Sequence, residues 1–184
     1  MIYFRCKFVV QLPMTEKEFK IQVLPLSKNV YPMARRMLLS DDLAYDAVQQ
    51  CMMKLWENRR QLDRCSNIKA FVFKVVKNIC LDEIKRKKPV VFDEPSDYLN
   101  LSPQHNDQHE KNETVEIIQR IIDELPANQR EAIQLRDIDG LDFVEIAEIL
   151  DTDVAYARVL LSRARKSVKE KYEKIYAYEA IQRQ

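Results

Sequence analysis

The chain contains 184 residues, of which 46% are hydrophobic and 32% are charged, and its formal net charge is +1. This length permits one domain or two small ones, and the apolar content excludes a chain that is disordered throughout. Gly140 is the only glycine, which argues against a fold rich in tight β-turns and favours helices joined by short connections. No apolar run approaches the roughly 20 residues that cross a bilayer, and the first residues lack a convincing signal-peptide core. We therefore expect a cytoplasmic protein.

The four cysteines, at positions 6, 51, 65 and 80, form no Cys-x-x-Cys pair and have no partnering histidines. Cys51 and Cys80 fall at apolar helical positions, so we expect buried, reduced thiols. His105 and His109 have a spacing found in metal ligands, but no cysteine or carboxylate constellation accompanies them. The sequence therefore predicts no metal site and no cofactor.

The first block of helical periodicity covers residues 15–88. Its first helix is expected from about Glu16 to Leu39, and prolines are expected to kink or divide it at Pro25 and Pro32. Met14 is a possible alternative start, because the residues that follow it open a helix cleanly.

Two further helices are expected in this block. One follows a cap at Ser40 or Asp41 and keeps apolar residues at i, i+3 and i+4 spacing as far as Trp56. A polar stretch over residues 57–65 then leads to a helix that Ser66 caps and Pro89 stops.

A connector and a second helical block follow. The connector, residues 89–113, contains three prolines and no apolar period, and reads as an extended linker with a net charge of −5. The second block covers residues 114–175, and a helix within it is expected to start with Pro126 in its first turn and to stop near Gly140.

The end of the second block has the pattern of a helix-turn-helix. Asp142 and Glu145 form a capping-box pattern before a short apolar helix. A three-residue turn, residues 151–153, then separates this helix from a long basic helix that begins at Val154.

Basic residues concentrate in two parts of the chain. Residues 54–88 carry eleven Lys or Arg against four acids, a net charge of +7, and residues 151–174 carry seven against four, a net of +3. Rows of Lys and Arg bind nucleic-acid phosphates by releasing condensed counterions, although a solvated helix face has the same composition. The coincidence with the helix-turn-helix pattern favours nucleic-acid binding.

Several segments resemble the sigma factors of bacterial RNA polymerase. Residues 46–56 (DAVQQCMMKLW) resemble the D-L-V-Q-E-x-F-x-x-L-W segment of sigma region 2, and residues 67–86 resemble its N-P-x-A-W-L-x-x-I-A-x-N-x-x-x-D-x-x-R-R helix. Residues 125–136, 140–147 and 161–165 resemble sigma region 4. The resemblance covers roughly residues 20–172 in the family's order, and the connector is too short for a region 3 domain.

This resemblance implies a sigma factor of the extracytoplasmic-function group, which is a DNA-binding specificity subunit and not an enzyme. It implies an all-α fold with a region 2 domain at residues 15–88, a flexible linker at 89–113 and a region 4 helix-turn-helix domain at 114–175. The implied partners are core RNA polymerase, through its β′ clamp and β flap, promoter DNA, and an anti-sigma protein.

The resemblance also implies roles for residues of region 2. The polar stripe on the second helix is expected to dock on the polymerase β′ clamp through Asp46, Gln49 and Gln50; Gln50 stands where the family usually has Glu, and an amide lacks a charge-assisted contact. Residues from the loop at 58–67 and the helix after it are expected to capture the single-stranded −10 element. These residues are Arg59, Arg60, Asn67, Lys69, Lys74, Lys77, Asn78 and Arg86. Phe71 and Trp56 fall on apolar stripes and are expected in the core rather than under DNA bases, whereas the pattern does not assign Phe73.

In region 4, the basic helix is expected to lie in the major groove of the −35 element with Asp153 as its N-cap. Leu160 stands where the family usually has an arginine that contacts DNA, so the −35 sequence is not predicted. The expected contacts to bases or phosphates are Asp153, Tyr156, Arg158, Ser162, Arg163, Arg165 and Lys166.

Other interpretations remain open at this point. The acidic connector either threads the nucleic-acid channel of the polymerase, with Asp93, Glu94 and Asp97 in place of RNA phosphates, or is a solubilising tether. The main alternative for the whole chain is a one-component helix-turn-helix regulator that binds duplex DNA as a dimer. An enzyme has little support, because the sequence has no Gly-rich phosphate loop and no credible nucleophile-base pair.

Overall fold

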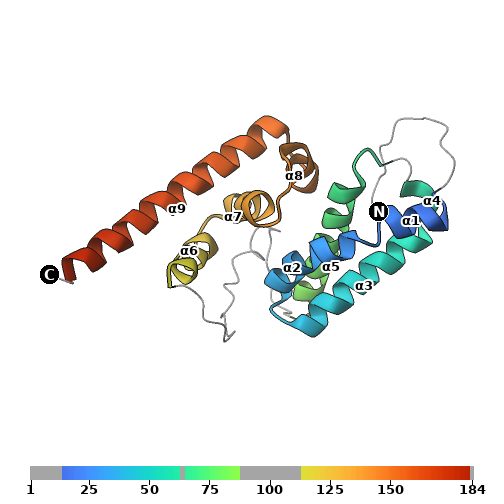
Figure 1. Ribbon diagram of the computed structural model, residues 1–184, viewed down its shortest axis with the longest axis horizontal. Coiled ribbons are helices and arrows are strands. Elements are labelled where there is room, and N and C mark those ends of the chain that lie inside the picture. Colours follow the sequence, from blue (N-terminus) through green and yellow to red (C-terminus); the bar gives the residue numbers. More distant parts are fainter. Residues whose placement is uncertain (1–13, 63–64, 88–112, 183–184) are drawn as a thin grey trace. The chain divides into compact units, whose positions relative to one another are not determined.

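The computed structural model describes residues 14–62, 65–87 and 113–182 of the chain. Every regular element in these ranges is a helix, which confirms the predicted all-α fold (Figure 1). The chain divides into two compact units, residues 1–89 (unit 1) and 90–184 (unit 2). The predicted linker, with His105 and His109, lies outside the described residues except for Glu113, which is the first residue of a helix. Among the helices described, none is both long and apolar enough to cross a membrane.

Unit 1 is built from three longer helices that pack against one another and two short ones. The longer helices are α2 (Leu26–Leu38), α3 (Asp41–Glu57) and α5 (Ile68–Lys87). The short helices are α1 (Glu16–Gln22) and α4 (Arg59–Leu62). Helix α4 lies within the stretch that the sequence predicted to be only polar connection.

The predicted first helix is divided and not merely kinked, and division was one of the two expected effects of its prolines. The break falls at residues 23–25, directly before α2, whereas Pro32 lies inside α2 without ending it. A proline in a helix interior costs roughly 3 kcal/mol. Val30, Met33 and Ala34 of the same helix are buried, and burial of a Val or Met side chain contributes about 1.5–3 kcal/mol each. Packing therefore outweighs the proline.

The predicted cap of α5 is corrected by one residue. Asn67, not Ser66, caps the helix, because its Oδ1 atom accepts a hydrogen bond from the backbone N–H of Ala70 at 3.0 Å. Both residue types are good caps, so the sequence pattern alone does not separate them. At α3 the first of the two expected caps is the one observed, since Ser40 Oγ accepts from the N–H of Leu43 and Asp41 is the first residue of the helix.

The core of unit 1 is formed by α2, α3 and α5 together. Phe73, which the periodicity left unassigned, is fully buried and is the largest such side chain. Phe71 and Trp56, which were predicted in the core, are only half-buried. The 20-residue helix α5 therefore presents Phe73 to the core at a position that the apolar stripe missed.

Unit 2 contains α6 (Glu113–Asp123), α7 (Ala127–Ile133), α8 (Phe143–Ile149) and the long α9 (Val154–Gln182). Helices α6, α7 and α8 each pack against α9. The core cluster consists of Ile122, Leu125, Ile133, Leu161 and Ala164. The N-terminal half of α9 is thereby held in place by three other helices.

A π-helical turn, η2 (Gln134–Ile138), continues α7 and ends before Gly140. The only glycine of the chain has a φ of 69°, a conformation that glycine adopts without the steric penalty of a Cβ. Beyond it, Leu141 is fully buried. Pro126 is the N-cap of α7 rather than a residue of its first turn, which corrects the prediction by one position.

Candidate functional site

The helix-turn-helix is formed by α8, a turn and the start of α9. Asp142 and Glu145 form the predicted capping box, since Asp142 Oδ1 accepts from the N–H of Glu145 at 2.8 Å and Glu145 Oε2 accepts from the N–H of Asp142 at 2.7 Å. In the turn, Asp151 has a φ of 52°. Asp153 is the predicted N-cap of α9, because its Oδ1 atom accepts from the N–H of Tyr156 at 2.7 Å.

The first turns of α9 have one buried side and one exposed side. The buried residues are Ala157, Leu160, Leu161 and Ala164. Leu160, which stands where the resemblance expects an arginine, is a core residue here and is only 4% exposed. Six of the predicted −35 residues are exposed on the rest of this segment: Asp153, Tyr156, Arg158, Ser162, Arg163 and Lys166.

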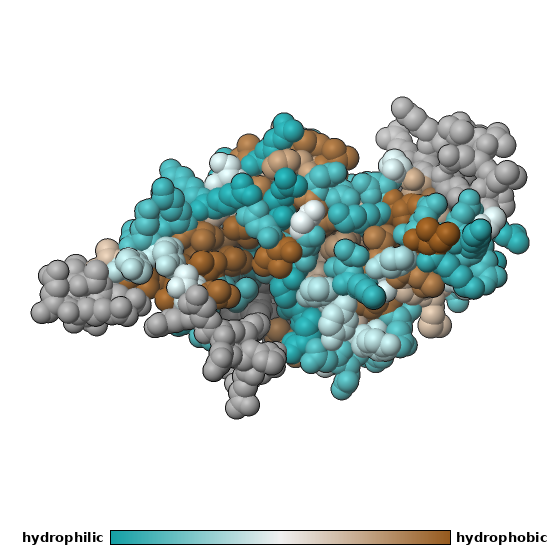
Figure 2. Space-filling view, in the orientation of Figure 1, coloured by the Kyte–Doolittle hydropathy of each residue, from teal (hydrophilic) through white to brown (hydrophobic). Residues whose placement is uncertain are grey.

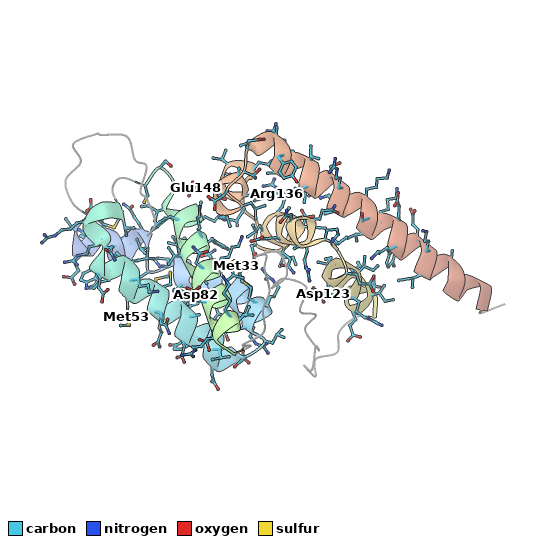
Figure 3. The ribbon with its side chains drawn as sticks, turned by 180° about the vertical axis from the view of Figure 1, so that it is seen from behind. Met33, Met53, Asp82, Asp123, Arg136 and Glu148 are labelled. Carbon is cyan, nitrogen blue, oxygen red and sulfur yellow. The ribbon has the colours of Figure 1, made fainter. Side chains whose placement is uncertain are left out.

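Two arginines of this region are positioned by the ring of Phe143. The guanidinium carbon of Arg158 lies 5.3 Å from the ring centroid, and that of Arg136 lies 5.0 Å from it. Arg136 also donates a hydrogen bond to the backbone oxygen of Leu141 at 2.6 Å. Figure 3 labels Arg136 beside Glu148 on this side of unit 2. The sequence did not single out Arg136 or Phe143 for this role, because the contacts join separate helices.

Arg165 is the remaining member of the seven residues predicted to contact the −35 element. It makes an ion pair with Asp137 of η2. Its Nε atom donates to Asp137 Oδ2 at 3.0 Å, and a terminal nitrogen donates to Oδ1 at 2.5 Å. These hydrogen bonds raise the pKa of Arg165. The Arg165 side chain is exposed, but the Asp137 carboxylate partly neutralises its positive charge.

Unit 2 also has an apolar groove between α6 and α9 that the sequence did not predict. Its volume is about 490 Å³, and it is lined by apolar side chains from both helices and from η2, among them Ile118, Ile138, Val168 and Tyr172. Ile138 is 46% exposed. Figure 2 shows apolar surface along α6 and α9. A groove between helices depends on contacts far apart in sequence, which local periodicity does not contain.

In unit 1, the polar stripe of α3 is exposed as predicted from its spacing. Asp46, Gln49 and Gln50 are all exposed, whereas Ala47 and Cys51 on the opposite side are buried. A small polar groove of about 210 Å³ lies between α3 and α5, with Asp46 and Gln50 on one wall. The other wall comes from α5 and includes Asp82, Glu83 and Arg86.

Two large apolar side chains also lie on the exposed surface of α3. Tyr45 is 59% exposed and Met53 is 62% exposed. They flank Gln49 at i−4 and i+4, so the three side chains form one row. Figure 3 shows Met53 projecting away from the helix. The i, i+4 spacing of the three residues in the sequence predicts that they form a row. It does not predict that the two large apolar side chains of this row are exposed.

The predicted −10 residues do not form one cluster. Arg59 covers the ring of Trp56, with its guanidinium carbon 4.1 Å from the ring centroid, and also donates to the Trp56 backbone oxygen at 2.9 Å. Arg60 is exposed beside it. Asn67 uses its side-chain oxygen to cap α5.

On α5 the structure groups some of the predicted −10 residues and separates others. At 100° per residue, Lys74, Lys77 and Asn78 share one side of the helix. Lys69, in the first turn, and Arg86, near the other end, lie on different sides from this group. Arg86 pairs with Glu83 at 2.8 Å.

Two charged side chains of unit 2 are buried among the described residues, Glu145 and Arg130. The Arg130 side chain is 5% exposed, and burial lowers its pKa, while the nearby carboxylates of Asp123 and Glu131 act in the opposite direction. Arg130 lies on α7 inside the unit and not on the exposed side of α9. The part of the chain that the structure describes holds no group of three or more His, Cys, Asp or Glu side chains able to bind a metal.

The comparisons with known proteins agree with both units. Residues 24–90 match the family described as Sigma-70 region 2, and residues 115–168 match the family described as Sigma-70, region 4. The extracytoplasmic-function sigma factors SigM and SigW of Bacillus subtilis are 26% and 25% identical to the chain over 148 and 152 residues. These matches cover 79% and 77% of this chain, and 90% and 81% of the two relatives.

A shorter match and a solved structure add to this. The sigma-E factor of Escherichia coli is 41% identical over 58 residues, which is 32% of this chain and 30% of that protein. The sigma factor RpoE of Bartonella quintana, solved in complex with the anti-sigma factor NepR, has the same fold, with a TM-score of 0.61 and 24% identity. That likeness covers 85% of this chain and 98% of that one.

The two helical units, with a helix-turn-helix in the second, define a sigma subunit of RNA polymerase. The chain belongs to the sigma-70 family, in its extracytoplasmic-function group. The alternative of a one-component regulator is not favoured. Members of this family are in general not enzymes.

Proposed function

We propose that this sigma factor binds core RNA polymerase through unit 1 and recognises promoters with both units. In this proposal residues 15–88 form the region 2 domain, residues 89–113 the linker, and residues 114–175 the region 4 domain. It acts in the cytoplasm, where it brings the polymerase to promoters. The observation that supports this most directly is the start of α9, where a buried row leaves a basic surface exposed.

The proposed docking surface for the β′ clamp is the polar stripe of α3. Asp46, Gln49 and Gln50 are exposed on one helix that is fixed from behind by its buried side. The row of Tyr45, Gln49 and Met53 adds apolar area to the stripe. This area compensates for the amide at Gln50, which makes weaker contacts than the Glu usual in the family.

The proposed −10 contacts use two surfaces of unit 1. Arg59, Arg60 and Asn67 lie around the loop before α5, and Lys74, Lys77 and Asn78 follow one side of that helix. Bases that leave the duplex are captured at the loop while the cations hold the strand by its phosphates. Lys69 and Arg86 remain proposed contacts at either end of α5.

The apolar groove of unit 2 is the proposed site for the β flap. A groove lined by α6 and α9 fits an amphipathic helix that lays its apolar side into it. Of the seven proposed −35 contacts, only Arg165 lines the groove, so the other six on the N-terminal part of α9 stay available for DNA. An anti-sigma protein is a further proposed partner, as in the complex of the Bartonella relative. Its occupancy of these exposed surfaces would compete with the polymerase.

The test is in vitro transcription with the purified protein and sigma-free core polymerase on pooled genomic fragments, with sequencing of the RNA 5′ ends. We expect discrete starts that share two spaced upstream elements and that disappear without the protein. Gln49→Ala should weaken core binding, whereas Asn29→Ala removes an exposed amide of α2 and should have no effect. If the protein gave no specific starts but bound duplex DNA tightly by itself, the regulator alternative would replace this proposal.

A further inference from the structure

The exposed side of α9, the second helix of the helix-turn-helix, has an uncharged centre over its first two and a half turns. The buried residues Ala157, Leu160, Leu161 and Ala164 define the direction of the core. At 100° per residue, Ala155, Val159 and Ser162 lie within roughly 30° of the opposite direction. Over the first two and a half turns of α9 this central line therefore holds two apolar side chains and one hydroxyl, and Lys166 is the first charged residue on it. Val159 is 40% exposed.

Charged side chains flank this line on both sides. Arg158 and Arg163 lie roughly 70° from the centre, on opposite sides of it, and both are exposed. Arg158 also lies against the ring of Phe143 of α8, with its guanidinium carbon 5.3 Å from the centroid. The flanks thus match the two rows of phosphates that border a major groove, and the centre faces the groove floor.

The chemistry of the centre limits what it can read. Ala155 and Val159 have no side-chain donor or acceptor, so they cannot pair with the polar edges of guanine, adenine or cytosine. The apolar group that base pairs present in the major groove is the 5-methyl of thymine. Val159 offers two methyl groups to it, while Ala155 lets the helix approach the floor closely.

We propose that Val159 reads a thymine 5-methyl group in the −35 element, and that Arg158 and Arg163 hold the flanking phosphates. This rests on the proposed function, since it names the base that the same surface recognises. Pairing of arginine with guanine is the commonest direct contact in the major groove. In this proposal that contact is not made at the centre of the exposed side of α9, because both arginines lie on its flanks. Specificity at this position comes from apolar contact.

The experiment starts from a promoter mapped by the transcription assay. Each thymine of its −35 element is replaced in turn by deoxyuridine, which lacks only the 5-methyl group, and holoenzyme affinity is measured by competition. For the wild-type protein we expect one substitution to weaken binding about fourfold, the effect of losing one buried methyl-sized contact. Val159→Ala should bind the thymine and deoxyuridine forms of that position equally.

Arg163→Ala is the matched control on the same helix. It should weaken binding to both duplexes by the same factor and lower the slope of log affinity against log salt by about 0.9. The proposal is overturned if no deoxyuridine substitution affects the wild type, if Val159→Ala keeps the full discrimination, or if the element contains no thymine. Each of these outcomes leaves mapped, protein-dependent starts in place, whereas failure of the proposed function gives no such starts.

Discussion

At the scale of single residues, Arg165 shows how a motif residue acquires a second partner in the fold. The resemblance assigns it to DNA, and the structure pairs it with Asp137. The two side chains are 56% and 34% exposed, so the pair contributes only about 0–1 kcal/mol to stability. Its larger expected effect is on the charge that this end of the proposed −35 surface presents to phosphates.

We therefore predict that Asp137→Asn increases affinity for duplex DNA. Without the carboxylate charge beside it, Arg165 is able to contact a DNA phosphate. One added phosphate contact should steepen the slope of log affinity against log salt by about 0.9. Fluorescence anisotropy titrations of holoenzyme at several salt concentrations measure this slope. Glu116→Gln, which removes an exposed carboxylate of α6, is the control. Equal effects of the two variants would mean that only net charge matters.

The two buried thiols are a second feature at this scale. The prediction that Cys51 and Cys80 are buried is confirmed, and burial raises the pKa of each thiol to about 12 from its usual value of 9.0. Cys65 is only half-buried. A thiolate is the reactive form, so the two core thiols should be inert in the folded protein.

We expect iodoacetamide at pH 8 to modify Cys65 in the native protein and to reach Cys51 and Cys80 only after unfolding, as peptide mass spectrometry can show. The raised pKa values also have a consequence for stability. Unfolded thiols ionise near pH 9 while the folded ones remain protonated, so the free energy of unfolding should fall as pH rises above about 9. Fast native labelling of Cys51 would contradict the packing between α3 and α5.

At the scale of elements, caps were predicted well where two signals coincided. Asp142 and Glu145 satisfy each other in both directions, and the sequence showed both partners at the required spacing. At α5 only one signal was present, and the sequence pattern did not distinguish Ser66 from the adjacent Asn67, which is the observed cap. The π-helical turn η2 had no sequence signal; Leu135 within it and Leu141 after it are both buried.

Asp142→Ala should destabilise unit 2 by about 1 kcal/mol, because the first turn of α8 loses its side-chain acceptor. Asp142→Asn retains an acceptor oxygen and should retain most of the stability. Urea unfolding followed by far-ultraviolet circular dichroism measures both variants. If the two variants were equally destabilised, the lost charge rather than the lost cap would be the cause.

At the scale of the whole molecule, the sequence pattern predicted the order of the helices and which side of most of them is buried. The amphipathic spacing of α3 predicted which residues are exposed, and the family resemblance covered both units. The burial of Phe73, the half-exposure of Phe71 and the groove between α6 and α9 could not be predicted. These features depend on which helices meet, and neither periodicity nor residue type records that.

The separation of the chain into two units leads to a prediction about combined variants. Gln49→Ala lies in unit 1 and is proposed to affect polymerase docking, whereas Arg163→Ala lies in unit 2 and is proposed to affect −35 recognition. Their effects on the free energy of forming the polymerase–promoter complex should add within about 0.5 kcal/mol. Competition binding with the single and double variants measures this sum. A larger deviation would show that polymerase docking and −35 recognition are coupled.

The contact between Arg59 and Trp56 should make the intrinsic tryptophan fluorescence of the protein sensitive to binding of DNA at Arg59. Trp56 is the only tryptophan of the chain, and its ring also makes a T-shaped contact with the ring of Phe19 at a centroid distance of 5.1 Å. A nucleic-acid phosphate that draws the guanidinium away would remove a positive charge from above the indole and shift its emission. The intrinsic fluorescence of the unlabelled protein would then follow capture of the −10 strand in real time, with no signal from duplex bound at the −35 surface alone.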